Sequence, residues 1–99
     1  MHETKYQHDI AVKIEDEILP GSIVLWNDPS KRQGIPDLIV LYGPGWAGLE
    51  VKMYEGAPER PNQGHYVGRM NDMSFGAFIY PENEEEVLYA LQQSLGAPG

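Results

Sequence analysis

Apolar and polar residues follow one another along the chain with two different spacings, and the first spacing is helical. In the N-terminal segment an apolar residue returns at every fourth position, at Tyr6, Ile10, Ile14 and Ile18. Residues spaced in this way share one face of a helix, so the pattern predicts an amphipathic helix over residues 4–19. Pro20 and Gly21 follow at once, and this pair predicts the end of the helix.

Four later segments are rich in β-branched and aromatic residues, which is typical of strands. We expect these strands at residues 22–27, 37–42, 46–52 and 75–80. The second is almost continuously apolar from Leu38 to Leu41, and such a run is typical of a strand buried on both faces. Trp26 and Trp46, in the first and third of these segments, are expected in the core or in an interface.

Two further helices are expected between and after the strands. The apolar residues on one side of the helix over 62–73 are Tyr66, Met70 and Met73. Gly64 and Gly68 share a face of it, and they indicate either close packing or a weak helix. Pro81 opens the last helix, whose acidic first turns suit the positive end of a helix dipole. The order α-β-β-β-α-β-α predicts an α/β fold with helices flanking a central mixed four-stranded sheet.

Length and composition restrict the classes of protein to consider. The 99 residues are enough for a single domain, which we place at residues 1–95, followed by a flexible tail at 96–99. No run approaches the roughly 18 apolar residues of a membrane span, and the polar N-terminus is not a secretory signal. The absence of cysteine excludes disulfides, thiol nucleophiles and cysteine-based zinc sites. It fits a cytoplasmic protein, in the host cytoplasm if the protein comes from a phage.

Three charged residues form a candidate site. Asp37 opens the apolar second strand, and Glu50 and Lys52 lie two positions apart on the third, so both point to the same face. A hairpin of these two strands brings Asp37 and Glu50 together, and two converging carboxylates repel each other. Oxygen ligands of this kind suit Mg²⁺ or Mn²⁺, and the backbone carbonyl of Val51 adds a further oxygen. The alternative is a surface ladder of ion pairs across two strands, which contributes little stability.

These residues are similar to a known nuclease signature. Gly34-Ile35-Pro36-Asp37, twelve further residues and then Glu50-Val51-Lys52 resemble the motif of PD-(D/E)xK nucleases. The closest resemblance is to the VRR-NUC branch and to phage Holliday-junction resolvases, in which a glutamine opens the following helix. Gln63 matches that glutamine. The resemblance covers essentially the whole chain and implies a restriction-endonuclease-like core.

The resemblance implies an endonuclease that hydrolyses DNA phosphodiester bonds with Mg²⁺, for which Mn²⁺ can substitute. Asp37, Glu50 and the Val51 carbonyl would hold the metal, Lys52 would organise the attacking water, and Gln63 would steady Lys52, the water or a phosphate. Stand-alone members of this branch are associated with branched DNA and with homodimers.

A glutamate in the first helix often completes the metal site in this family, and Glu3 is the best match. If Thr4 caps the helix, however, Glu3 lies outside it.

The net charge of −8 argues, taken alone, against binding to nucleic acid. The acids are unevenly placed, however, because residues 28–72 carry six acids and five bases. The bases that we expect to contact DNA are Lys31, Arg32, Arg60 and Arg69. Two other functions stay open: an acidic protein that mimics DNA and binds without catalysis, and a degenerate nuclease fold kept for oligomerisation.

Overall fold

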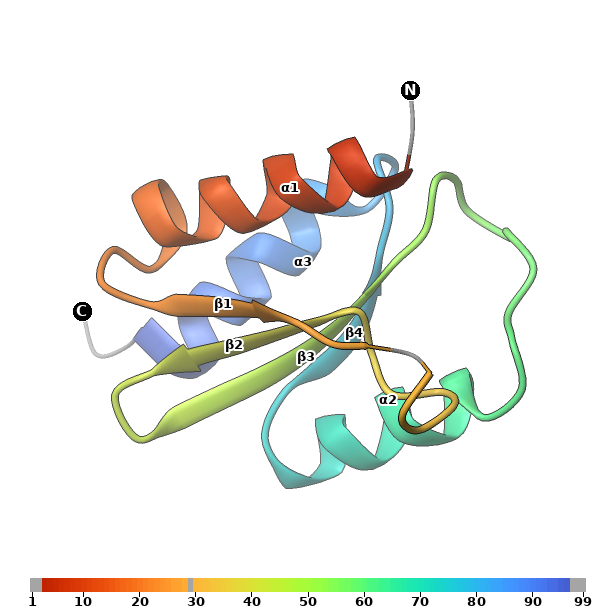
Figure 1. Ribbon diagram of the computed structural model, residues 1–99. Helices are drawn as coiled ribbons and strands as arrows, with labels where there is room; N and C mark the ends of the chain where they lie inside the picture. The colour runs from red at the N-terminus through yellow and green to blue at the C-terminus, as the bar shows by residue number, and fades with distance from the viewer. Residues whose placement is uncertain (1–2, 29, 97–99) are drawn as a thin grey trace.

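The computed structural model of the protein describes residues 3–28 and 30–96, and it shows a four-stranded sheet with helices on both faces (Figure 1). The helices are α1 (Glu3–Lys13), α2 (Gln63–Met73) and α3 (Glu84–Leu91), and π-helical segments η1 (Ile14–Ile18) and η2 (Gln92–Gly96) extend α1 and α3. The strands are β1 (Ile23–Trp26), β2 (Leu38–Tyr42), β3 (Gly45–Val51) and β4 (Gly76–Ile79). The predicted element order is confirmed. None of the helices in these ranges is long and apolar enough to cross a membrane.

The sheet is mixed, as predicted, and its strands lie in chain order. β2 pairs antiparallel with both β1 and β3, and β4 pairs parallel with β3. Gly43 and Pro44 form the two-residue turn of the β2–β3 hairpin, with Gly43 at a φ of 57° that favours glycine. The register sets Leu38 opposite Leu49, so the residue before β2, Asp37, comes beside Glu50.

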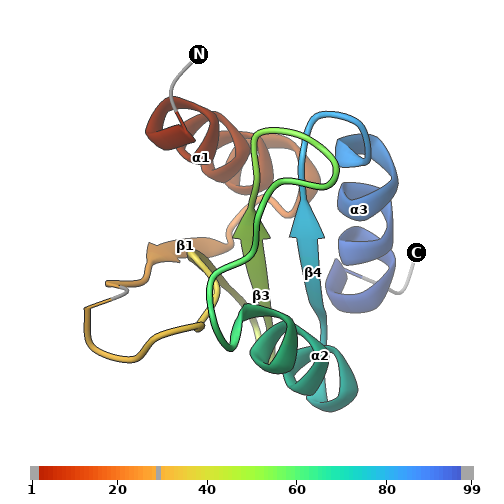
Figure 2. The ribbon, with the colours of Figure 1, turned by 90° about the vertical axis from the view of Figure 1, so that its right-hand side faces the viewer.

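The side chains of the strands alternate between the two faces of the sheet, and each face packs against different helices. One face of the sheet packs on α1 and α3 and forms the main core, which includes Ile10, Ile14, Val40, Leu49 and Leu91. α2 packs on the other face, over β3 and β4 (Figure 2). The predicted stripe of the first helix is confirmed for Tyr6, Ile10 and Ile14, which are buried in this core.

Two helix predictions need correction. The last helix begins at Glu84 rather than at Pro81, because Asn83 holds the preceding residues in a turn by accepting the Tyr80 N–H and donating to the Phe78 carbonyl. In α2, Met73 is exposed. The packing face of that helix runs instead through Gln63, Val67 and Met70, which lie on one side at spacings of four and three.

The prediction that the second strand is buried on both faces is wrong for half of its residues. Leu38 and Val40 lie in the core, but Leu41 is 38 % exposed and Ile39 is only partly buried. These two residues lie on the α2 side of the sheet, where α2 covers β3 and β4 and leaves the β1–β2 half open. Of the predicted tail, Gly96 belongs to η2, and residues 97–99 lie outside the described residues.

Candidate active site

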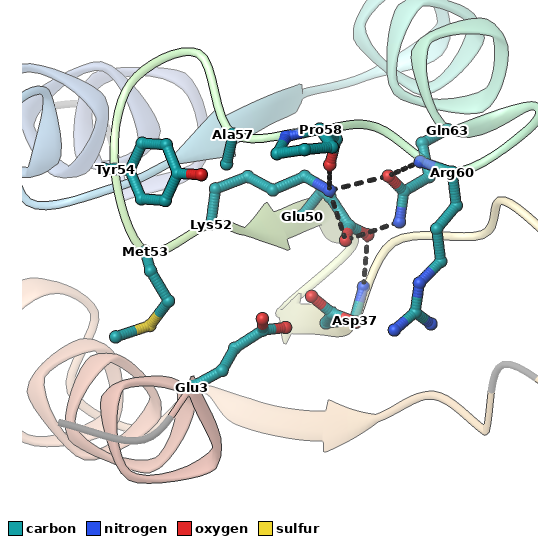
Figure 3. A pocket seen from close by; sticks show the side chains of 10 residues that line it. All are labelled: Glu3, Asp37, Glu50, Lys52, Met53, Tyr54, Ala57, Pro58, Arg60 and Gln63. Carbon is teal, nitrogen blue, oxygen red and sulfur yellow. Dashed lines mark hydrogen bonds and ion pairs between the residues drawn. The ribbon is translucent and has the colours of Figure 1, made fainter.

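The predicted site residues meet where β3 ends, at the edge of the sheet where α1 and α2 both begin (Figure 1). A cavity of about 230 Å³ lies there. Its lining side chains are shown in Figure 3 and include Glu3, Asp37, Glu50, Lys52, Arg60 and Gln63. Residues from distant parts of the chain therefore line one cavity. Most of the polar residues at its centre were predicted from the sequence.

Asp37 and Glu50 are fixed to each other through the backbone of the hairpin. The backbone N–H of Asp37 donates to Glu50 Oε1 at 3.2 Å, and the N–H of Val51 donates to Asp37 Oδ2 at 3.0 Å. Each carboxylate thus accepts a hydrogen bond from the strand that carries the other. The two acids are held in place by the register of β2 and β3 rather than by flexible side-chain contacts.

Glu50 is buried, with only 2 % of its surface exposed. Burial, and after it the neighbouring charge of Asp37, together raise the pKa of its carboxyl to about 8. Lys52, whose Nζ lies 3.9 Å from Glu50 Oε2, acts against this shift. The alternative of a surface ladder of ion pairs is therefore excluded, because the acid at its centre is not at the surface.

Gln63 connects the acid to the lysine. Its side-chain Nε2 donates to Glu50 Oε2 at 2.8 Å, while its Oε1 accepts from Lys52 Nζ at 2.8 Å and from the Arg60 N–H at 2.8 Å. Gln63 is 5 % exposed, so it is not a solvated residue at a helix start. A buried amide with both ends bonded fixes the distance and the orientation of its partners.

The loop between β3 and α2 adds one contact that sequence reasoning missed. The carbonyl of Pro58 accepts a hydrogen bond from Lys52 Nζ at 3.0 Å. Together with Gln63, it directs the ammonium group across the cavity beside Glu50 (Figure 3). A backbone carbonyl carries no signal in the residue type, so only the path of the loop could reveal it. Tyr54 of the same loop also lines the cavity and was not predicted.

Glu3 is the first residue of α1, and it extends toward the cavity from the side opposite Gln63 (Figure 3). It lies inside the helix, contrary to the alternative in which Thr4 caps it. Within residues 3–28 and 30–96, no three His, Asp or Glu side chains lie close enough together to hold a metal ion. The role of Glu3 as a third ligand therefore stays a prediction.

The donor set fits a hard divalent cation. Asp37 and Glu50 offer carboxylate oxygens from adjacent strands, and their mutual repulsion contributes to the raised pKa of Glu50. A cation between them would offset this repulsion, and Mg²⁺ and Mn²⁺ favour oxygen ligands of this type. Asp37, Glu50 and the Val51 carbonyl are the residues that would hold it.

The seven basic residues fall into two groups. Lys5, Lys13 and Lys52 pair with acids. The other four form no ion pair with the part of the chain that the structure describes, and they are the predicted DNA contacts Lys31, Arg32, Arg60 and Arg69. Arg60 lines the cavity, and Arg32 lies over the ring of Tyr66 at 5.8 Å, which links the β1–β2 loop to α2.

Comparison with known proteins defines the fold. No family model matches the sequence, and no curated protein matches it. A solved structure titled "VRR_NUC domain protein" is similar with a TM-score of 0.68 and 16 % identity, covering 97 % of this chain and 89 % of that chain. A second, titled "VRR_NUC domain", has a TM-score of 0.66 and 24 % identity, covering 92 % of this chain and 95 % of that chain.

The chain therefore shares a mixed α/β fold with these solved structures. More narrowly, its fold is the one seen in these two solved structures titled as VRR_NUC domains. The resemblance noted in the sequence is confirmed at the level of the fold, over nearly the whole chain.

Proposed function

We propose that this protein is a metal-dependent endonuclease that hydrolyses DNA phosphodiester bonds and selects branched DNA. The observation that carries the proposal is the buried assembly of Asp37, Glu50, Lys52 and Gln63 at the open edge of a VRR-NUC fold. A purely structural role does not require a carboxylate that burial and a neighbouring acid make costly to ionise. The preference for branched DNA follows from the family resemblance.

A bound Mg²⁺, or Mn²⁺ in its place, would supply polarisation of the phosphate and a water of lowered pKa. The chain's own groups prepare the cavity for this chemistry. Gln63 and the Pro58 carbonyl hold the Lys52 ammonium in one place, where it can donate a hydrogen bond to a water or to a phosphate oxygen. Arg60, on the rim of the same cavity, offers a second cation to the phosphate.

The distribution of charge supports DNA approaching from the side of α2. The four bases that form no ion pair within residues 3–28 and 30–96 come from the β1–β2 loop, the β3–α2 loop and α2, whereas acids crowd η1 and the start of α3. In Figure 2 the β1–β2 loop and α2 lie below the sheet, and α1 and α3 lie above and beside it. DNA bound on the α2 side would avoid most of the acidic surface.

The experiment that tests the proposal is a cleavage assay on a labelled four-way junction and a matching linear duplex, with Mg²⁺ or Mn²⁺. The wild type should cleave the junction in preference to the duplex. Asp37→Asn should fold normally, lose Mn²⁺ binding by calorimetry, and cleave at least about a hundredfold more slowly, because one metal ligand is gone. The matched control is Asp9→Asn, which removes an exposed acid that pairs with Lys5. Unchanged Mn²⁺ affinity or unchanged cleavage in Asp37→Asn would contradict the site.

The alternative function, an acidic mimic of DNA, makes a different prediction for Lys52. A mimic needs exposed carboxylates and does not need a buried ammonium, so Lys52→Ala would leave its binding partner bound. A nuclease loses cleavage in the same variant. The burial of the Lys52 side chain, which is 12 % exposed, favours the nuclease.

A further inference from the structure

A second cavity, of about 150 Å³, adjoins the cavity of the candidate active site. The two cavities share three lining residues, Lys52, Tyr54 and Ala57, all from the loop that follows β3. The rest of the lining differs, because the second cavity has the rings of Phe78 and Tyr80 where the first has the pair of carboxylates. A ligand that occupies the first cavity can therefore extend directly into the second.

The register of β3 and β4 places these rings beside the polar centre of the site. Phe78 pairs with Glu50, and the N–H of Lys52 donates to the Ile79 carbonyl at 2.9 Å. Paired residues of neighbouring strands point to the same face of a sheet, so Phe78 lies on the side that carries Glu50. Tyr80 follows two positions later and lines the same cavity. One step across the sheet therefore leads from the buried carboxylate to the aromatic lining.

Tyr54 supplies a third ring from the loop between β3 and α2. Its side chain is 52 % exposed, but the backbone on both sides of it is held. The Ala57 N–H donates to the Tyr54 carbonyl at 3.2 Å, and the Glu55 N–H donates to Glu82 Oε1 at 3.2 Å. Figure 3 shows the Tyr54 side chain directed toward Ala57. A ring carried on a fixed backbone loses little freedom when a ligand binds, which favours its use as a contact.

We call the second cavity the aromatic pocket, defined by Tyr54, Phe78 and Tyr80. Among the residues that the structure describes, the main core includes none of these three rings, so core packing does not account for them. Aromatic faces stack on nucleobases, and this stacking needs no positive charge, which suits a chain with a net charge of −8.

The charge of the aromatic pocket favours a base over a phosphate. Glu59 also lines it, and this carboxylate would repel a phosphate but can accept a hydrogen bond from the amino group of a base. The ammonium group of Lys52, by contrast, is held on the side of the first cavity by Gln63 and the Pro58 carbonyl. The two cavities therefore offer separate places for the phosphate and the base of one nucleotide strand.

We propose that the aromatic pocket receives one unpaired base of the DNA strand whose phosphate occupies the first cavity. The inference rests on the proposed function, and it gives the selection of branched DNA a physical cause. A base within a continuous duplex must leave both its stack and its partner to enter the pocket. A base at a branch point or a bulge leaves at a lower cost, so the pocket would favour DNA with such a base.

The experiment compares two duplexes that carry one unpaired nucleotide at the same place. In one duplex this nucleotide bears the base 2-aminopurine, and in the other it is an abasic site, so both have the same phosphates. Fluorescence anisotropy, with Ca²⁺ in place of Mg²⁺, measures their binding. The wild type should bind the duplex with the base about tenfold more tightly, and 2-aminopurine fluorescence should fall as the base stacks.

Three variants test whether the preference comes from the aromatic pocket. Tyr54→Leu keeps an apolar side chain without a ring and should reduce the preference to less than about twofold. Tyr54→Phe keeps the ring and should retain the preference. The matched control is Tyr89→Leu, which replaces a tyrosine of α3 that is 65 % exposed and lines neither cavity. It should leave the preference unchanged, and circular dichroism should be the same for all three variants.

The inference is overturned by a wild type that binds neither duplex or both equally, by Tyr54→Leu keeping the preference, or by Tyr54→Phe or Tyr89→Leu losing it. These results do not depend on cleavage. A wild type that prefers the base but cleaves no DNA would contradict the proposed function and leave base binding by the aromatic pocket standing. A wild type that cleaves the four-way junction without preferring the base would overturn this inference alone.

Discussion

The carboxyl group of Glu50 stands in a position that costs the folded protein stability. It is buried, it faces Asp37, and its pKa is raised to about 8. In the unfolded chain the same group ionises near the ordinary pKa of about 4.3. Between these two values the folded state binds more protons than the unfolded state, so the free energy of unfolding falls as the pH rises.

This linkage gives a prediction for the pH dependence of stability. From pH 5 to pH 9 the wild type should lose on the order of 1–3 kcal/mol through Glu50, with the loss complete above the folded-state pKa. Glu50→Gln should remove this fall, because the amide does not ionise. Glu86→Gln replaces an exposed glutamate of α3. Its free energy of unfolding should fall with pH as that of the wild type does. Urea unfolding at several pH values measures the free energy in each variant, and equal slopes for the wild type and Glu50→Gln would contradict the role of Glu50.

At the scale of elements, the contact between α2 and β4 sets the position of Gln63. Gly76 begins β4, and a Cβ built there would lie 2.8 Å from the backbone nitrogen of Asn71 and in contact with the Val67 carbonyl. Both neighbours are backbone atoms of α2, which cannot move aside without shifting the helix. The absence of a side chain at Gly76 is therefore what lets α2 lie against the sheet.

Two glycine substitutions test this contact. Gly76→Ala should lower the free energy of unfolding by about 2–4 kcal/mol, because the added methyl overlaps helix backbone. Gly68→Ala should raise it by about 0.5–1 kcal/mol, because nothing lies within 4 Å of its Cβ position and alanine favours the helix. The same finding shows that, within the described part of the chain, nothing packs closely against Gly68. Thermal or urea unfolding of both variants measures the difference, and a neutral Gly76→Ala would show that α2 is not fixed by this contact.

At the scale of the whole molecule, the proposed function requires an acidic protein to bind DNA through a small basic surface. The four bases without ion pairs in the described ranges are Lys31, Arg32, Arg60 and Arg69. If each contacts one phosphate, the logarithm of the binding constant should fall with the logarithm of salt concentration with a slope of about −3 to −4 for each chain.

Single substitutions show how much each basic residue contributes to this salt dependence of DNA binding. Arg60→Ala should make the slope shallower by about one, because one phosphate contact is lost. Lys13→Ala should leave it unchanged, because Lys13 pairs with Glu84 on the other side of the sheet. Fluorescence anisotropy of a labelled junction, with Ca²⁺ in place of Mg²⁺, measures binding at several salt concentrations. If both substitutions changed the slope equally, the electrostatic field of the whole molecule, and not a local basic surface, would govern DNA binding.

The sequence by itself determined the order of the elements, the mixed sheet and the polar centre of the candidate site. These features are local, because strand alternation puts Glu50 and Lys52 on one face and a short hairpin brings Asp37 beside them. The motif spacing placed Gln63 at the start of the next helix, and the structure places it there. Residue type and spacing were sufficient wherever the physical cause lies within one hairpin or one helix.

Only the tertiary structure decided what depends on contacts between distant segments. The Pro58 carbonyl reaches Lys52 because of the path of a loop, and a carbonyl is the same in every residue type. Burial of Glu50 comes from the packing of Gln63 and the loop above it, so no pattern in the strand could predict its raised pKa. The exposure of Leu41 in the second strand was hidden for the same reason, since an apolar run shows that a surface avoids water but not which element covers it.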